Sequence, residues 1–104
     1  MVRVDDPETY KKYTAETPAI IKSYGGKFLV RGGDVEALEG EAFNDRLVVV
    51  EFASKDAARK FYNSDDYQRV IGFRHESSKA QFLLADGVPT GTAAPDDKVV
   101  KSGS

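Results

Sequence analysis

Apolar positions in the first quarter of the chain recur at intervals of three and four residues. This spacing places them on one side of a helix, and that side must cover another part of the protein. Asp6 as N-cap and Pro7 at the first helical position predict its start, and Gly25–Gly26 predicts its end. Pro18 is expected to bend or briefly break the helix, because it lacks the amide that would bond to Thr14. The recurring positions are Tyr10, Tyr13, Thr17, Ile20, Ile21 and Tyr24.

Three further apolar stretches have the composition of β-strands. Lys27–Arg31 lies between two glycine pairs, and Val35–Leu38 is expected to continue this strand after a bulge or bend at Gly32–Gly33. Leu47–Phe52 is the clearest strand, since it is apolar and β-branched at nearly every position, which predicts burial on both faces. Lys79–Ala85 is expected to form the last strand.

Two shorter helices are predicted between the last two of these strands. Ser54 is a suitable N-cap for the first helix and Ser64 for the second, where Asp65 and Asp66 complement the positive end of the helix dipole. The buried side of the first is expected to contain Ala57, Ala58, Phe61 and Tyr62, and that of the second Tyr67, Val70, Ile71 and Arg74.

The order of these elements predicts a fold. With a brief first strand at Val2–Val4, it is the βαββαβ order of the ferredoxin-like α+β fold, an antiparallel sheet with helices on one face. Since Leu47–Val50 and Phe82–Leu84 are apolar without alternation, the other face also needs cover. We expect a second copy of the chain to supply it, as a homodimer through the sheets. Val2–Val4 is short for the central strand of such a sheet. Either this strand is naturally short, or natural N-terminal residues are missing from this sequence.

Composition narrows the class of protein. The 104 residues allow one domain, expected at residues 1–88, and the proline, glycine and serine content of residues 89–104 is typical of a flexible tail. With 15 basic and 17 acidic side chains, the chain has a net charge of −2. It therefore lacks the excess of positive charge that binding to nucleic acid or an anionic membrane would favour. The absence of cysteine excludes disulfides and thiolate metal sites. No signal peptide or membrane-length apolar run occurs, so we expect a cytoplasmic protein.

Two longer segments carry a family resemblance. YGGKFLVRGGDVEALEG (Tyr24–Gly40) and RLVVVEFASKDAARKFYNSDDYQ (Arg46–Gln68) resemble the uncharacterised family called domain of unknown function 1330, within the dimeric α+β barrel superfamily. The resemblance covers roughly Val4–Val88, and the chain departs from it at its short N-terminus and in its tail. It implies a ferredoxin-like fold and a barrel made by two facing sheets, and it implies no particular reaction.

Glu51 and Arg31 are charged residues in strands that should pair with each other. A carboxylate on the same face as Leu47 and Val49 is costly unless it is paired, so the two residues are expected to form an ion pair. One interpretation is purely structural. The other is that both line a cavity between sheet and helices, where Arg31 binds an acidic or phenolic ligand and Glu51 acts as acid or base.

His75 and Arg74 are the second pair of candidates. The lone histidine fits a favourable cation at the end of a helix, and proton transfer or haem ligation are the alternatives, the last of them without a second ligand in the sequence. Arg74 is either an exposed arginine without a specific role or part of an anion site.

Tyr62 and Tyr67 carry hydroxyls that either reach water and carbonyl groups or contact a ligand. No zinc-protease, serine-hydrolase or phosphate-loop motif is present, so we expect neither a metal nor a cofactor. Two hypotheses follow. The chain is a small-molecule-binding dimer, which could be a cofactor-free enzyme, or it is a non-catalytic homodimeric interaction or stress-associated protein.

Overall fold

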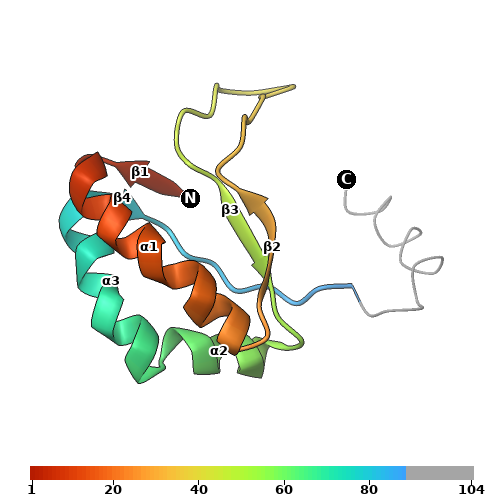
Figure 1. The fold of residues 1–104 in the computed structure, drawn as a ribbon. Coiled ribbons are helices and arrows are strands. Elements are labelled where there is room, and N and C mark those ends of the chain that lie inside the picture. The colour runs from red at the N-terminus through yellow and green to blue at the C-terminus, as the bar shows by residue number, and fades with distance from the viewer. Residues whose placement is uncertain (89–104) are drawn as a thin grey trace.

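The computed structural model describes residues 1–88 and has a mixed α+β fold, as the sequence predicts (Figure 1). The expected C-terminal tail, residues 89–104, lies outside the described part. No helix in residues 1–88 is long and apolar enough to cross a membrane. In chain order the elements are β1 (Val2–Val4), α1 (Pro7–Ser23), β2 (Lys27–Arg31), β3 (Val48–Glu51), α2 (Lys55–Tyr62), α3 (Asp65–Ser77) and β4 (Ser78–Ala80).

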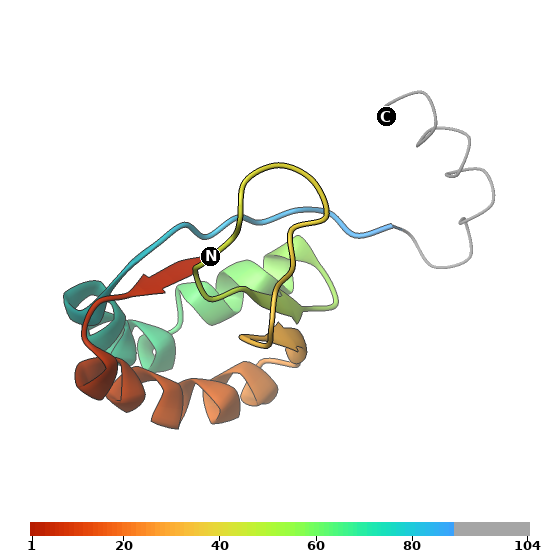
Figure 2. The same ribbon diagram turned by 90° about the horizontal axis from the view of Figure 1, so that it is seen from above.

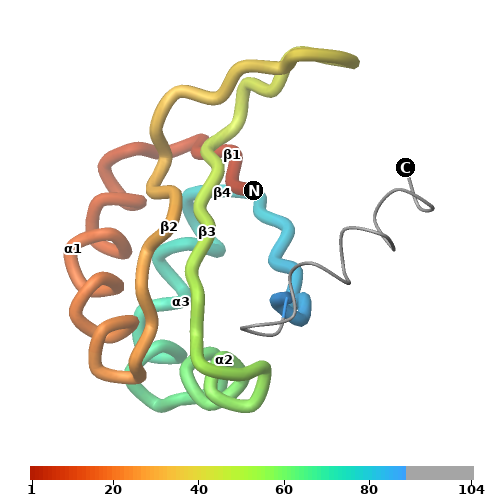
Figure 3. The backbone as a smooth tube through the Cα atoms, turned by 90° about the vertical axis from the view of Figure 1, so that its right-hand side faces the viewer, coloured from red at the N-terminus to blue at the C-terminus, as the bar shows by residue number. Residues whose placement is uncertain are grey.

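The strands form two antiparallel pairs. β1 pairs with β4, so that Val2 lies opposite Ala80, and β2 pairs with β3, so that Phe28 lies opposite Val50. A single bridge links the pairs: the Val2 amide donates to the Arg46 carbonyl at 2.8 Å and the Arg46 amide to the Val2 carbonyl at 2.7 Å. Figure 3 shows β2 and β3 side by side, and Figure 1 shows the helices to one side of them. β1 therefore connects the two pairs at one end.

The predicted helix starts are confirmed. The carboxylate of Asp6 accepts hydrogen bonds from the amide of Thr9 at 3.3 Å and from its hydroxyl at 2.8 Å, and these bonds lower the pKa of Asp6. Ser54 accepts from the amide of Ala57, and Ser64 from the amide of Tyr67, each at 3.1 Å. Each helix thus begins where a side chain near its first turn satisfies a free amide.

Pro18 does not interrupt α1, so the expected break is wrong. The helix runs without a gap from Pro7 to Ser23. Proline removes one backbone hydrogen bond, but Thr17, Ile20 and Ile21 around it are buried against the rest of the molecule. Their packing holds the helix together across the missing bond.

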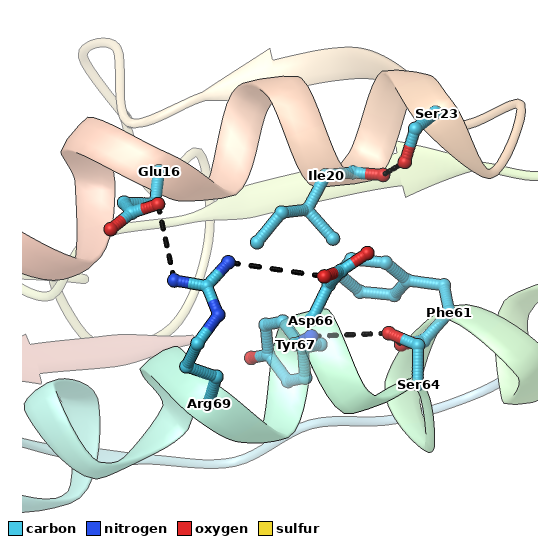
Figure 4. A network of polar contacts seen from close by, with 8 residues as sticks. All are labelled: Glu16, Ile20, Ser23, Phe61, Ser64, Asp66, Tyr67 and Arg69. Carbon is cyan, nitrogen blue, oxygen red and sulfur yellow. Dashed lines mark hydrogen bonds and ion pairs between the residues drawn. The ribbon is translucent and has the colours of Figure 1, made fainter.

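The hydrophobic core lies on the helix side of the molecule. α1 and α3 lie side by side (Figures 1 and 2), with aromatic rings between them and α2. The centre of the Phe61 ring lies 4.6 Å from the centre of the Tyr67 ring and 5.3 Å from that of the Phe52 ring. At the edge of this core, the guanidinium of Arg69 in α3 lies 3.5 Å from a carboxylate oxygen of Glu16 in α1 and 3.9 Å from a carboxylate oxygen of Asp66 (Figure 4). The buried apolar residues are Val2, Tyr10, Tyr13, Ile20, Ile21, Phe61, Tyr67, Val70 and Ile71.

Three predictions about strands are wrong. Val35–Leu38 is a loop, so it does not continue β2. The chain does bend at Gly32, which is one of the two alternatives predicted there, while a register shift lies inside β2, between Phe28 and Val30. The last strand is Ser78–Ala80 and not Lys79–Ala85, because the residues after Ala80 have no strand beside them within residues 1–88. β3 is not buried on both faces, since Val49 is 39% exposed. The errors share a cause. Apolar composition shows that a segment needs to be covered, but the described single chain does not supply that cover.

Candidate functional site

A cavity of about 660 Å³ lies between the helices and the β2–β3 pair. Its helix side contains the rings of Tyr10, Tyr13 and Tyr67, and its strand side contains Val48 and Val50. Residues 81–85, after β4, close another side. The cavity exists because the buried core is concentrated around α1 and α3, whereas no residue of β2 or β3 is fully buried. A space of this size and largely apolar lining is typical of a small-molecule site.

The charged side chains that line this cavity are all basic. They are Arg31, Arg46 and Arg59, and none of the lining residues is an aspartate or glutamate. Arg59 is neutralised by Asp56, at 2.9 Å. Within residues 1–88, Arg31 and Arg46 form no ion pair. The cavity therefore carries positive charge without a protein counter-charge.

The guanidinium of Arg46 lies close to the backbone at Gly32. Gly32 has a φ of +69°, a conformation that favours glycine, and any Cβ at this position would collide with the Arg46 guanidinium. The Nε of Arg46 is buried and has no hydrogen-bond partner in the described chain. Burial raises the pKa of the nearby Tyr10, and Arg46 opposes part of this effect. Arg46 thus keeps an unused donor beside the cavity.

The hydroxyls of Tyr13 and Tyr67 meet at 2.6 Å, although the residues are 54 positions apart. Their rings pack edge to face at 6.0 Å. Burial, followed by the neighbouring Tyr67, raises the pKa of Tyr13 well above its ordinary value. Tyr13 therefore keeps its proton at neutral pH and can act as a hydrogen-bond donor, but not as a base.

The expected Arg31–Glu51 ion pair is wrong. The register places Lys27 opposite Glu51 and Arg31 opposite Val48, at the two ends of the paired strands. Arg31 lies instead over the ring of Phe28, with its guanidinium carbon 4.7 Å from the ring centre, and it lines the cavity. Glu51 is exposed and outside the cavity lining, so the geometry does not support its expected role as acid or base.

Of the other predicted site residues, Tyr62 and Tyr67 line the cavity, as the ligand hypothesis requires. Arg74 and His75 do not. They line a separate recess of about 490 Å³ together with Tyr62, Ser78, Ala80 and Phe82. The alternative of an exposed Arg74 is wrong, because this residue is only 5% exposed. His75 is exposed in the last turn of α3, which fits the prediction of a cation at a helix end.

Arg46 was not predicted as a site residue, and Tyr10 and Tyr13 were predicted only as core residues. An arginine directly before an apolar strand was the available signal for Arg46, and it is a weak one. Tyr10 and Tyr13 do pack in the core, but they also line the cavity. Within residues 1–88, no group of three or more histidine, aspartate or glutamate side chains is arranged to hold a metal ion.

Fold and site together define a mixed α+β protein with a basic, largely apolar cavity between its helices and a β-strand pair. The chain belongs to the family described as a domain of unknown function, DUF1330, whose model matches residues 1–88. The family resemblance noted in the sequence is thereby confirmed. A comparison with curated proteins finds no match.

Proposed function

We propose that this protein binds a small acidic or phenolic molecule with an apolar body in the cavity between its helices and strands. The observation that supports this proposal is the combination of Arg31 and Arg46 with a cavity lining that contains no carboxylate. Arg31 is exposed, but Arg46 is half-buried and its Nε is buried without a partner, so this guanidinium has lost part of its hydration. An anionic ligand would compensate for that loss. The aromatic and β-branched lining would contact the rest of the ligand.

The tyrosines suit the same class of ligand. Tyr13 keeps its proton, so its hydroxyl, or that of Tyr67, can donate to a carboxylate or phenolate oxygen. The same donor could stabilise negative charge that develops on oxygen during a reaction. Cofactor-free catalysis by this route is the enzymatic form of the proposal.

We further propose a ferredoxin-like homodimer of the dimeric α+β barrel type. The Val2–Arg46 bridge would place β1 between β4 and β3, which gives the strand order of that fold. Large apolar side chains on the strand side favour cover by a second copy. They include Leu29 at 53% exposed, Leu83 at 73% and Leu84 at 44%.

The test compares benzoate with its uncharged analogue benzamide by isothermal titration calorimetry. Benzoate is expected to bind saturably, and Arg46→Gln to weaken it roughly ten- to a hundredfold, as expected for loss of a charged hydrogen bond. Benzamide should bind at least about tenfold more weakly than benzoate, because it lacks the charge. Arg69→Gln, which removes an exposed arginine outside the cavity, is the matched control and should not change binding. Equal binding of benzamide and benzoate, or binding of neither, would contradict the proposal.

A non-catalytic homodimeric interaction or stress-associated protein is the second candidate. The exposed apolar segment after β4, which includes Phe82 at 47% and Val88 at 69% exposed, favours it. Native mass spectrometry of freshly purified protein separates the two candidates. A dimer that carries extra bound mass supports ligand binding, whereas a bare dimer together with no benzoate binding supports the interaction role.

A further inference from the structure

Arg74 is the one charged residue that is buried within residues 1–88, at 5% exposed. It forms no ion pair with any aspartate or glutamate of the described chain. Its Nε is buried and has no hydrogen-bond partner there. A buried arginine normally has a carboxylate or phosphate partner, because an unpaired charge loses its hydration without compensation. The structure therefore leaves one strong positive charge without an anion.

The surroundings of Arg74 are aromatic and keep it charged. Its guanidinium carbon lies 4.1 Å from the centre of the Phe82 ring and 5.9 Å from that of Tyr13. Burial lowers the pKa of Arg74, but the hydroxyls of Tyr67, Tyr13 and Tyr62 outweigh it, so that the pKa is raised. Ring faces and neutral hydroxyls orient a guanidinium group without neutralising it.

Arg74 is also not needed to end its helix. The carbonyl of Phe73 accepts from the hydroxyl of Ser77 at 2.6 Å, and the carbonyl of Arg74 accepts from that of Ser78 at 2.7 Å. These are carbonyls near the C-terminus of α3 that a basic side chain could otherwise bind. Because serine hydroxyls already satisfy them, helix capping does not explain the buried charge.

Arg74 lines the recess of about 490 Å³ described above, and none of the six residues that line it is acidic. The recess is also lined by His75 and Tyr62, whose side chains can donate hydrogen bonds, and by Ser78, whose hydroxyl already donates to the Arg74 carbonyl. Tyr62 and Phe82 line both this recess and the larger cavity, so their side chains lie between the two. We propose that the recess is a second binding site, which takes an oxyanion, either a carboxylate or a phosphate group, with Arg74 as its counter-charge.

The test uses nuclear magnetic resonance on the whole chain with acetate and methyl phosphate as probes. His75 is the sole histidine of the sequence, so its imidazole signal reports on the recess without ambiguity, and the Nε–H signal of Arg74 reports on the charge. Both signals are expected to shift saturably with at least one probe. Chloride at equal ionic strength should not reproduce the shift. The probe that saturates at the lower concentration distinguishes a carboxylate from a phosphate ligand.

Arg74→Gln is expected to weaken probe binding roughly ten- to a hundredfold, and Arg74→Lys by a smaller factor, because lysine keeps the charge but not the planar pair of donors. Arg69→Gln on the same helix is the matched control, since Arg69 is exposed and paired with Glu16. If the Arg74 variants do not fold, His75→Gln at an exposed position should still weaken binding severalfold. Linear shifts without saturation, or equal shifts with chloride, overturn the proposal even without any variant.

Discussion

The helix side and the strand side of this molecule differ in how well a single chain covers them. Around α1 and α3, Tyr67 and Val70 are fully buried, and aromatic rings from three helices pack against one another. On β2 and β3, Leu29 is 53% exposed and Val49 39% exposed. Burial of apolar surface on the helix side therefore contributes most of the folding free energy, whereas the strand side is left available for a ligand or a second copy.

The largest expected effect tests the helix side. Tyr67→Ala should lower the free energy of unfolding by about 3–5 kcal/mol, because it empties a fully buried aromatic site. Val49→Ala should cost less than about 1 kcal/mol at low protein concentration, because Val49 is already partly exposed. Urea denaturation at several protein concentrations measures both.

The two variants should also differ in how their stability depends on protein concentration. The loss from Tyr67→Ala should be the same at every concentration, since its contacts lie within one chain. The loss from Val49→Ala should grow with concentration if a second copy covers the strands. Equal losses for the two variants at low concentration would contradict the contrast between the two sides.

The next effect concerns how the strand side holds its arginine. Gly32→Ala and Gly25→Ala both place a side chain at positive φ, +69° and +81°, which costs roughly 1–2 kcal/mol. Only at Gly32 would the new Cβ also displace the Arg46 guanidinium, since nothing lies near a Cβ at Gly25. Because the displaced group is the end of a flexible side chain, we expect the two variants to lose similar stability in urea denaturation, and only Gly32→Ala to weaken benzoate binding. Unchanged benzoate binding in Gly32→Ala would mean that Gly32 does not position Arg46.

A further effect tests the Tyr13–Tyr67 hydroxyl pair. Tyr13→Phe should cost about 1–2 kcal/mol, because it leaves the buried hydroxyl of Tyr67 without this partner. The double variant Tyr13→Phe/Tyr67→Phe should cost less than the sum of the single variants, which a double-mutant cycle measures. Additive losses would show that the two hydroxyls do not stabilise each other.

The same pair predicts a pH dependence. The folded chain holds the pKa of Tyr13 above its ordinary value of 10.0, so the folded state keeps this proton more firmly than the unfolded state. Its contribution to stability is complete below about pH 10 and is lost as pH rises further. Between pH 8 and a pH above 10, the free energy of unfolding should therefore fall less in Tyr13→Phe than in the wild-type protein.

Local features of the chain were predictable. The N-caps Asp6, Ser54 and Ser64 were identified correctly, because a cap depends on a few neighbouring residues. The buried face of α3 was predicted from helical spacing, with Arg74 on it. Strand limits were less predictable, since a run such as Phe82–Leu84 becomes a strand only where another strand lies beside it.

The candidate site was predictable only in part. Arg31, Tyr62 and Tyr67 were named from the sequence and do line the cavity. The Arg31–Glu51 pair failed because a bulge inside β2 and the register of its partner set which residues lie opposite each other. Arg46 was missed because its burial depends on contact with Gly32 across the fold.

The sequence alone determined the α+β class and the starts of the helices, because these depend on spacing and capping over short stretches of chain. It also indicated the family, through two longer segments. The tertiary structure decided which distant groups meet. It brought Tyr13 to Tyr67, Arg46 to Gly32 and the buried Arg74 to a recess with His75. Such long-range contacts depend on packing and strand register, and no local sequence pattern encodes them.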